Sequence, residues 1–252
     1  CDWSSDVCSS DLAVSGNPEY PPVLWVRGDG SGALAGVAVE LLEDALKGRP
    51  ERAQVRYVGA WSRVQQEARE GRLDMIAGAF ITDERQTWMD YIQPAFLVMP
   101  NVVFVRKDAP FTMNGWDDLR GKHGDTLINN SFGQAFDAYA REHLEIEGVA
   151  SIEQAFARLL LGRTDYVLYE QYQGYALAEA GGFADRITHL ASPISSEGLY
   201  FTLSKKSPCN TPQLRAHLTE KVRELVAQGV PEQRIQPALA RWLESRGAPT
   251  PP

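Results

Sequence analysis

The sequence has no uninterrupted apolar stretch of about 18 residues, the length that a membrane-spanning helix needs. Its most apolar part, residues 92–105, is interrupted by Pro94, Pro100 and Asn101. Runs of Lys and Arg are also missing, and the net charge is −8, from 25 basic against 33 acidic side chains. An acidic chain without a basic patch is a poor partner for nucleic acid or for an anionic membrane surface. These absences predict that the protein has no membrane span and binds no nucleic acid.

Cysteine is scarce, and two of the three cysteines lie in the first twelve residues, which read CDWSSDVCSSDL. This segment lacks the basic start and the apolar stretch of a signal peptide. It resembles translated sequencing-adapter read-through joined to a truncated gene, and a natural N-terminus without regular structure is the alternative. We predict that residues 1–12 are a non-native segment and leave them out of the predicted fold. Cys209 then has no partner in the chain, and an export signal is expected to have preceded the sequence.

Several motifs of enzymes and metal proteins are missing as well. There is no Gly-Lys-Ser/Thr phosphate-binding loop and no Gly-x-Ser-x-Gly nucleophile elbow. The four histidines are scattered without the spacing of metal ligands. Gly28, Gly30 and Ala33 match a loose dinucleotide-binding pattern, but Gly36 interrupts the segment before the next helix, so a turn is the better interpretation. The sequence therefore predicts no metal, no cofactor and no catalytic residue.

What the chain does contain is typical of a globular protein: 44% hydrophobic, 23% charged and 10% aromatic residues. Segments with strand patterns alternate with segments whose apolar residues recur at helical spacing, which predicts a parallel α/β fold. The first strand is expected at residues 13–15. A helix is expected at residues 82–91, after a nearly all-apolar strand at residues 73–77.

One four-residue pattern occurs twice. Residues 71–74 read Gly-Arg-Leu-Asp and residues 162–165 read Gly-Arg-Thr-Asp, each between an amphipathic helix and an apolar strand. Two similar lobes, each with its own parallel sheet, are the simplest interpretation, although four matching residues can also recur by chance. Because ligands bind beyond the carboxyl ends of parallel strands, we expect the functional site at those ends of both lobes.

Thr82 and Arg85 follow the apolar strand of the first repeat. Thr82 is a predicted helix N-cap. Arg85 stands in the first helical turn, where a cation is disfavoured by about 0.3–1 kcal/mol, so a second role is expected for it. Its guanidinium, with the free N–H groups of that turn, fits a carboxylate. The alternative is a surface arginine paired with Glu84 or Asp90.

Three further side chains are candidates because of their place after strands. Glu170 ends the strand of the second repeat and could neutralise an ammonium group, or could be a solvated acid at a strand end. Trp61 and Tyr20 lie in loops that follow strands, where the aromatic walls of a pocket are found. For these two the alternative is ordinary core packing.

Read in order, these segments resemble the polar amino-acid binding proteins of ABC importers, the extracytoplasmic solute-binding proteins of family 3. The most specific stretch is residues 71–78 followed by Thr82 and Arg85, which resembles the family pattern G-K-x-D-x-x-x-A-G-x-T-I-T-x-E-R. The other similar segments are residues 20–22 (an aromatic-x-Pro opening), 34–42 (L-x-G-F-D-V-D-L), 90–96 (D-F-S-x-P-Y), 116–122 (D-L-K-G-K) and 162–170 (G-R-x-D-A-x-x-x-D). The resemblance covers nearly everything from residue 13 onward.

The resemblance implies an α/β protein of the type II periplasmic-binding-protein class, a two-lobed clamshell with two crossover hinge strands. Lobe 1 would comprise residues 13–101 plus 200–252, and lobe 2 residues 102–199. The implied function is capture of a small amino-acid-like ligand between the lobes by a periplasmic monomer, and delivery to the membrane subunits of an ABC importer. Two alternatives exist on the same fold: an enzyme similar to cyclohexadienyl dehydratases, with Glu170 as general acid, and a ligand-sensing module.

The same resemblance implies the ligand-binding residues. Arg85 would hold the α-carboxylate together with Thr82 and the backbone of Gly78, and Glu170 would hold the α-ammonium where the family usually has Asp. The remaining implied positions are Asn17, the aromatic walls Tyr20 and Trp61, and the lobe-2 loop residues Asn129, Asn130, Ser131 and Gly133. Phe132 is bulky for this loop, and Glu170 is one methylene longer than Asp, so the ligand identity stays open.

Overall fold

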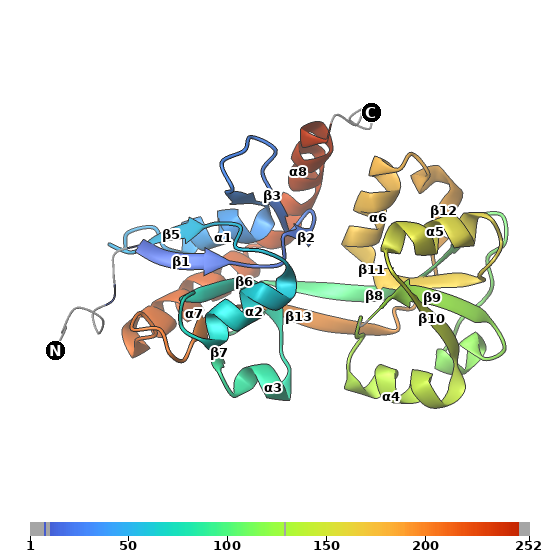
Figure 1. The fold of residues 1–252 in the computed structure, drawn as a ribbon, viewed down its shortest axis with the longest axis horizontal. Helices are drawn as coiled ribbons and strands as arrows, with labels where there is room; N and C mark the ends of the chain where they lie inside the picture. The colour runs from blue at the N-terminus through green and yellow to red at the C-terminus, as the bar shows by residue number, and fades with distance from the viewer. Residues whose placement is uncertain (1–7, 9–10, 129, 247–252) are drawn as a thin grey trace. The chain divides into compact units, whose positions relative to one another are not determined.

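The structure is a computed structural model that describes residues 8, 11–128 and 130–246. It divides into two compact units, which we call unit 1 and unit 2 (Figure 1). Unit 1 comprises the described residues up to Val98 and those from Gly198 on, and unit 2 is Met99–Glu197. The chain passes between the units within strand β8 (Leu97–Arg106) and again within strand β13 (Ser195–Ser204). The predicted lobe boundaries, after residues 101 and 199, lie a few residues further along the chain.

Unit 1 is built on a mixed sheet with the strand order β5-β1-β6-β13-β7. Three strands pair in parallel, namely β1 (Asp11–Ser15), β5 (Arg52–Val55) and β6 (Met75–Phe80). Strand β13 runs antiparallel to β6, and β7 (Met89–Tyr91) runs antiparallel to β13. The helices of this unit are α1 (Val37–Ala45), α2 (Trp61–Arg69), α3 (Asp83–Gln86), α7 (Pro212–Ala227) and α8 (Val230–Ser245). A small second sheet contains β2 (Glu19–Tyr20), β3 (Leu24–Val26) and β4 (Leu34–Ala35).

Strand β1 begins two residues before the predicted first strand. Asp11 and Leu12 pair with Arg52 and Ala53 of β5, and the Leu12 side chain is fully buried. It was therefore wrong to leave residues 11 and 12 out of the predicted fold. Both residues pair with β5, and the buried side chain of Leu12 adds to the core, so β1 begins at Asp11. The non-native origin of residues 1–12 stays a prediction.

Unit 2 repeats the same topology, with the strand order β10-β9-β11-β8-β12. Here β10 (Glu145–Val149), β9 (His123–Leu127) and β11 (Tyr166–Glu170) pair in parallel. Strand β8 runs antiparallel to β11, and β12 (Ile187–His189) runs antiparallel to β8. Its helices are α4 (Gln134–His143), α5 (Ile152–Leu160), α6 (Gln171–Ala180) and the short 3-10 helices η2 (Trp116–Leu119) and η3 (Ala184–Arg186). Two apolar clusters pack on this sheet, one around Phe104 and Phe156 and the other around Phe136 and Tyr166.

The repeated Gly-Arg-x-Asp pattern has the same structural role in both units. Asp74 accepts a hydrogen bond from the N–H of Ala13 on Oδ2 over 2.8 Å and donates its own N–H to the Ala13 carbonyl over 2.8 Å. Asp165 does the same with His123, at 2.8 Å in each case. In each unit the aspartate therefore joins one parallel strand to the start of the strand beside it. This equivalence supports two similar units rather than a chance recurrence.

The helix predicted at residues 82–91 is wrong in its second half. Helix α3 ends at Gln86, and residues 89–91 form strand β7, which pairs with Thr202, Leu203 and Ser204 of β13. The partner strand lies more than a hundred residues away in sequence, so a local pattern could not reveal the pairing. Tertiary hydrogen bonding has overridden the helical spacing of this segment.

None of the helices in the described ranges is both long enough and apolar enough to cross a membrane.

Candidate functional site

The predicted residues of unit 1 lie around the carboxyl end of β6. Gly78 is in this strand, at a point where the register with β13 shifts so that Ala77 pairs with Phe201 and Ala79 with Tyr200. Gly78 is thus the extra residue of a β-bulge, and its φ of +111° is one that residues with a Cβ rarely adopt. The bulge takes the peptide groups of Gly78 out of regular pairing with β13. Such groups are the ones that a bound ligand can use.

Thr82 is confirmed as a helix N-cap. Its Oγ1 accepts a hydrogen bond from the N–H of Arg85 over 3.1 Å at the start of α3. This contact places Arg85 in the only turn of a four-residue helix, directly after the strand end.

The Arg85 guanidinium is half-buried and held on three sides. Its Nε donates to Oε1 of Gln65 over 3.1 Å, and its Nη1 donates to the carbonyl of Phe80 over 3.1 Å. The indole of Trp61 packs against it, with 5.3 Å between Cζ and the ring centroid, a cation–π distance. Burial lowers the pKa of Arg85, although arginine keeps its charge at neutral pH. The result is an oriented cation next to an aromatic wall.

The Phe80 carbonyl is shared between Arg85 and Tyr91. The Tyr91 hydroxyl donates to it over 2.8 Å, and burial raises the pKa of this phenol to about 12. The phenol therefore remains a donor at all physiological pH values. By binding the same carbonyl, Tyr91 fixes the point to which the guanidinium is attached.

The alternative ion pairs predicted for Arg85 do not form among the described residues. Glu84 is instead bound to Arg69, and Asp90 lies 3.6 Å from Arg215 and 4.0 Å from Lys205. The two acids nearest to Arg85 in sequence thus have other partners. Among the described residues, no carboxylate lies within ion-pair distance of the Arg85 guanidinium.

The other predicted residues of unit 1 have less distinctive surroundings. Trp61 is the first residue of α2 and is half-buried. Asn17 follows β1, and its side-chain oxygen accepts the N–H of Glu19 over 3.1 Å, which closes a local turn. Tyr20 is half-buried in strand β2. Of these three, Trp61 contacts the Arg85 guanidinium.

In unit 2, Glu170 ends strand β11 and immediately precedes α6. Its side chain is only 4% exposed, so the alternative of a solvated acid at a strand end is wrong. Burial raises the pKa of Glu170 to about 7, while its own backbone N–H and the side chain of Asn130 act in the opposite direction. A carboxyl group with a pKa of about 7 changes its charge near neutral pH. Carboxyl groups with such raised pKa values are found mostly at functional sites.

The predicted loop of unit 2 is engaged by acids of its own unit. The Ser131 hydroxyl donates to Asp137, and the N–H of Phe132 donates to the same carboxylate over 2.9 Å. Gly133 precedes α4, and a Cβ placed on it would lie 2.5 Å from Oε1 of Glu197. In this arrangement the Ser131 hydroxyl and the Phe132 N–H are already paired with Asp137. Asn129, also predicted here, lies outside the described residues.

Sequence reasoning missed several polar residues that lie beside the predicted ones. Gln65 is one helical turn after Trp61, and Gln173 is three residues after Glu170, so helical spacing could have indicated both. Asn101 stands alone among apolar residues of β8, and a polar residue in such a strand is itself a signal. Tyr91 gave no signal, because its position in β7 depends on a distant strand.

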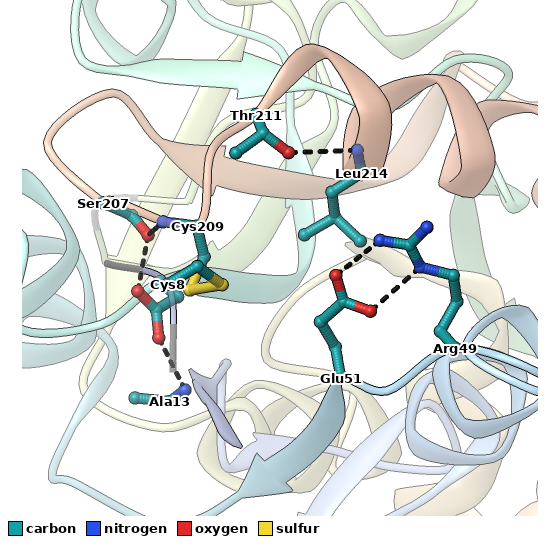
Figure 2. The surroundings of a disulfide bond; sticks show 9 residues. Cys8, Ala13, Arg49, Glu51, Ser207, Cys209, Thr211 and Leu214 are labelled. Carbon is teal, nitrogen blue, oxygen red and sulfur yellow. Dashed lines mark hydrogen bonds and ion pairs between the residues drawn. A yellow bond between two sulfur atoms is a disulfide. The ribbon is translucent and has the colours of Figure 1, made fainter. Parts of the chain in front are cut away.

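A disulfide bond of unit 1 lies at the amino ends of the parallel strands, away from the candidate site. Cys8 and Cys209 are bonded with 4.4 Å between their Cα atoms, so the prediction that Cys209 has no partner is wrong in this structure (Figure 2). Beside it, the Ser207 hydroxyl binds Asp74 and accepts the N–H of Cys209 over 3.0 Å. Asp74 precedes β6, whereas Thr82 and Arg85 follow β6. The disulfide is therefore at the amino end of the parallel strands, and the candidate site is at their carboxyl end.

A half-buried cation, Arg85, thus follows a parallel strand of unit 1, and a buried acid, Glu170, ends a parallel strand of unit 2. Two α/β units of the same topology, joined by two crossover strands, define the fold of a type II periplasmic binding protein. A family model of the bacterial extracellular solute-binding proteins, family 3, matches residues 12–244, and the chain belongs to this family.

Solved structures show the same fold. An amino acid ABC transporter substrate-binding protein, AbpA from Streptococcus pneumoniae bound to L-arginine, is 17% identical with a TM-score of 0.68, covering 91% of this chain and 94% of that one. A mutant of ArgBP from T. maritima is 20% identical with a TM-score of 0.65, covering 90% and 94%. A histidine kinase sensor domain with similarity to periplasmic binding proteins is 22% identical with a TM-score of 0.65, covering 96% and 98%. No curated protein sequence matches this chain.

Proposed function

We propose that this protein binds a small amino acid reversibly, without converting it, and delivers it to the membrane subunits of an ABC importer. The observation that carries the proposal is the state of Arg85. Its guanidinium is half-buried, oriented by Gln65 and Phe80, stacked on Trp61, and has no carboxylate partner within the described residues. A desolvated cation with open donor positions is suited to an anionic ligand group, and the planar fork favours a carboxylate.

Glu170 supplies the complementary charge in this proposal. Its buried carboxyl group would ionise on binding an ammonium group and form a charge-assisted hydrogen bond with it. An α-amino acid carries both kinds of group, a carboxylate that suits Arg85 and an ammonium that suits Glu170. Membership of the extracellular solute-binding family supports reversible capture, and we propose a periplasmic monomer.

The relatives suggest which amino acid to test first. AbpA was solved with L-arginine, and ArgBP belongs to the same group of structural neighbours. We therefore place L-arginine, ornithine and lysine at the head of a ligand panel that continues with the other proteinogenic amino acids, polyamines and small organic acids. Identities of 17–20% do not transfer specificity, so the panel is kept broad.

The test is a thermal-shift screen with this panel, followed by calorimetric titration of every positive compound. A ligand at ~100 times its dissociation constant should add ~2.7 kcal/mol to the free energy of unfolding, a shift that is easily measured. Stabilisation by at least one amino acid, lost in Arg85→Ala, supports the proposal. A screen in which no amino acid stabilises the wild type overturns it. Delivery is tested separately, by stimulation of the importer's ATPase with the loaded protein, since a sensory module would bind equally well and stimulate nothing.

One observation favours a second candidate function, a dehydratase. A general acid works best with a pKa near the working pH, and burial raises the pKa of Glu170 to about 7. The carboxylic acid would then protonate the ring hydroxyl group of a cyclohexadienyl acid, so that the C–O bond breaks and water leaves. The ring carboxylate would leave as CO2 in the same reaction, and the electron pair of its broken C–C bond would make the ring aromatic. Incubation with such an acid, followed by ultraviolet absorbance of an aromatic product, tests this. Turnover in the wild type that is abolished in Glu170→Gln would replace the binding function with an enzymatic one.

A further inference from the structure

Strand β13 is one of the two strands in which the chain passes between the units, and unit 1 resumes in it at Gly198. The next residue, Leu199, pairs directly with Phe80 at the end of β6. Phe80 is the residue whose carbonyl accepts hydrogen bonds from both Arg85 and Tyr91. The anchor of the Arg85 guanidinium therefore lies opposite the crossover strand, next to the point where that strand enters unit 1.

Tyr91 has a second link to the same crossover strand. Its ring meets the ring of Tyr200 edge to face, with 5.7 Å between the centroids and 84° between the planes, a favoured geometry for aromatic pairs. The backbone of β7 also pairs with β13, with Tyr91 opposite Thr202. The ring of Tyr91 is therefore held by β13, while its hydroxyl is held by the Phe80 carbonyl.

The Tyr91 phenol is also close to the helix that carries Arg85. Burial raises the pKa of this phenol to about 12, while the charge of Arg85 and the backbone of Thr82 act in the opposite direction. Thr82 is the N-cap of α3, and Arg85 lies in the single turn of that helix. One side chain thus connects the end of β6, the start of α3 and the crossover strand.

Tyr200 occupies the space beside Gly198. A Cβ placed on Gly198 would lie 2.6 Å from the Tyr200 hydroxyl oxygen and 2.8 Å from two carbons of its ring. Atoms that are not bonded do not pack this closely, so a side chain at position 198 would push the ring aside. The φ of Gly198 lies outside the left-handed range, so the glycine is required by the Tyr200 ring rather than by the backbone.

We infer that Tyr91 and Tyr200 are positioning residues that couple the Arg85 guanidinium to the crossover strand β13, and that this coupling requires glycine at position 198. The inference rests on the proposed binding function and adds residues that act on the ligand through Arg85. Without the Tyr91 hydroxyl, or with the Tyr200 ring displaced, the guanidinium gains freedom. A ligand carboxylate must then order it on binding, which lowers the affinity.

The first test needs no ligand and uses phenylglyoxal, a reagent that modifies accessible guanidinium groups. Peptide mass spectrometry of the full chain measures the rate of modification at Arg85. We expect this rate to rise roughly threefold in Tyr91→Phe, Tyr200→Leu and Gly198→Ala, because each change removes or disturbs one contact that holds the guanidinium.

Two controls distinguish a positioning role from a general loss of stability. Arg158 of unit 2 is a half-buried arginine bound to Asp125 and Glu147, and its rate of modification should stay at the wild-type value in every variant. Tyr139→Phe removes a hydroxyl that donates to Asp117 over 2.6 Å in unit 2, and it should leave the rate at Arg85 unchanged.

The second test is calorimetric titration with each amino acid that stabilises the wild type. Tyr91→Phe and Gly198→Ala should each bind about fivefold more weakly. In a Tyr200→Leu background, Gly198→Ala should cause no further loss, because the alanine then has no ring to displace, and a double-mutant cycle measures this. The control is Gly115→Ala, where no atom of the described residues lies within 4 Å of the added Cβ, and it should bind normally.

The outcomes separate this inference from the proposed function. The inference is overturned if Arg85 reacts at the wild-type rate in the three variants, or if Arg158 becomes equally faster. It is also overturned if the effects of Gly198→Ala and Tyr200→Leu on affinity simply add. In these cases the binding function stands, provided that an amino acid binds the wild type.

If no amino acid binds the wild type, the proposed function fails, and the phenylglyoxal rates alone decide the coupling of Arg85 to β13. A Gly198→Ala protein that does not fold leaves the decision to Tyr91→Phe, which keeps the ring and removes only the hydroxyl. A faster reaction at Arg85 in Tyr91→Phe, with Arg158 unchanged, then supports the inference, and an unchanged rate at Arg85 overturns it.

Discussion

The side-chain oxygen of Gln65 accepts a hydrogen bond from Nε of Arg85 over 3.1 Å. A guanidinium group offers two edges to a carboxylate, one formed by Nε and Nη2 and the other by Nη1 and Nη2. Because Gln65 occupies Nε, the first edge is no longer complete. A ligand carboxylate is therefore expected at the second edge, where Nη1 keeps one hydrogen beyond the one donated to Phe80.

Gln65 is expected to position Arg85 for binding. Gln65→Met keeps the side-chain volume but removes the acceptor, so the guanidinium gains freedom and affinity for the carboxylate ligand should fall about fivefold, roughly 1 kcal/mol. Gln66→Met is the matched control, since Gln66 is exposed and its amide binds Glu70 instead. Calorimetric titration of both variants checks this. Equal affinities in the two variants would show that Gln65 does not orient Arg85.

Arg85 should be essential for binding. Arg85→Ala leaves the ligand carboxylate desolvated and unpaired, a penalty of ~2–5 kcal/mol, so affinity should fall at least ~30-fold. Arg85→Lys should also bind poorly, because a point charge replaces the planar fork. Arg69→Ala, which removes a nearby surface arginine bound to Glu84, is the control and should bind normally. Normal binding by Arg85→Ala would show that the assignment of the unit 1 site is wrong.

Glu170 should make stability and binding depend on pH in opposite directions. Because burial raises the pKa of Glu170 from 4.5 to about 7, the folded protein resists ionisation that the unfolded chain accepts. The contribution of this group to stability is thus complete below pH 4.5 and is lost as the pH rises to about 7. In thermal melts without ligand, the Tm advantage of Glu170→Gln over the wild type should grow across this interval and stay constant above it.

Affinity for an ammonium ligand should instead rise as the pH increases toward 7, because binding needs the ionised carboxylate. Titrations of the wild type between pH 5.5 and 8 measure this, and Glu170→Gln should bind such ligands weakly with little pH dependence. If Glu170→Gln binds an amino acid as well as the wild type does at pH 8, the carboxylate does not pair with the ammonium group.

The two aspartates of the repeated motif should differ in their effect on stability. Asp74 is half-buried and accepts hydrogen bonds from both Ala13 and Ser207, so Asp74→Ala should cost ~1–3 kcal/mol of unfolding free energy. Asp165 is exposed, and within the described ranges its carboxylate accepts one hydrogen bond, from the N–H of His123, so Asp165→Ala should cost less. Urea unfolding of the two variants makes the comparison. A larger loss in Asp165→Ala would mean that unit 2 depends more on this strand junction than unit 1.

Cys209 should have no part in ligand binding. The Cys8–Cys209 disulfide lies at the amino end of the parallel strands of unit 1, and Arg85 follows their carboxyl end. Cys209→Ser should therefore leave the dissociation constant unchanged within error, while the loss of a cross-link lowers the Tm. Titration and melting of the variant, beside Cys8→Ser, separate the two effects. A large loss of affinity in either variant would contradict the placement of the site.

Much of the fold could be predicted because its signals are local. The alternation of helices and strands follows from hydrophobic periodicity, and the Gly-Arg-x-Asp pattern marks the same junction in both units because it includes both the helix end and the strand start. Thr82 was predictable as an N-cap, since its partner Arg85 is only three residues away. The site residues placed by such short-range contacts could be predicted for the same reason.

Contacts between residues far apart in sequence were decided only by the tertiary structure. The pairing of β7 with β13 turned a helical pattern into a strand, and the burial of Leu12 against β5 lengthened β1. The position of Asn101 opposite Glu170 depends on the register of two antiparallel strands, which no local sequence window contains. By itself the sequence determined that a cation and an acid follow strands in similar units. The sequence did not determine which neutral side chains orient Arg85 or surround Glu170. These contacts depend on strand register and helix placement, which are determined by the packing of the whole core.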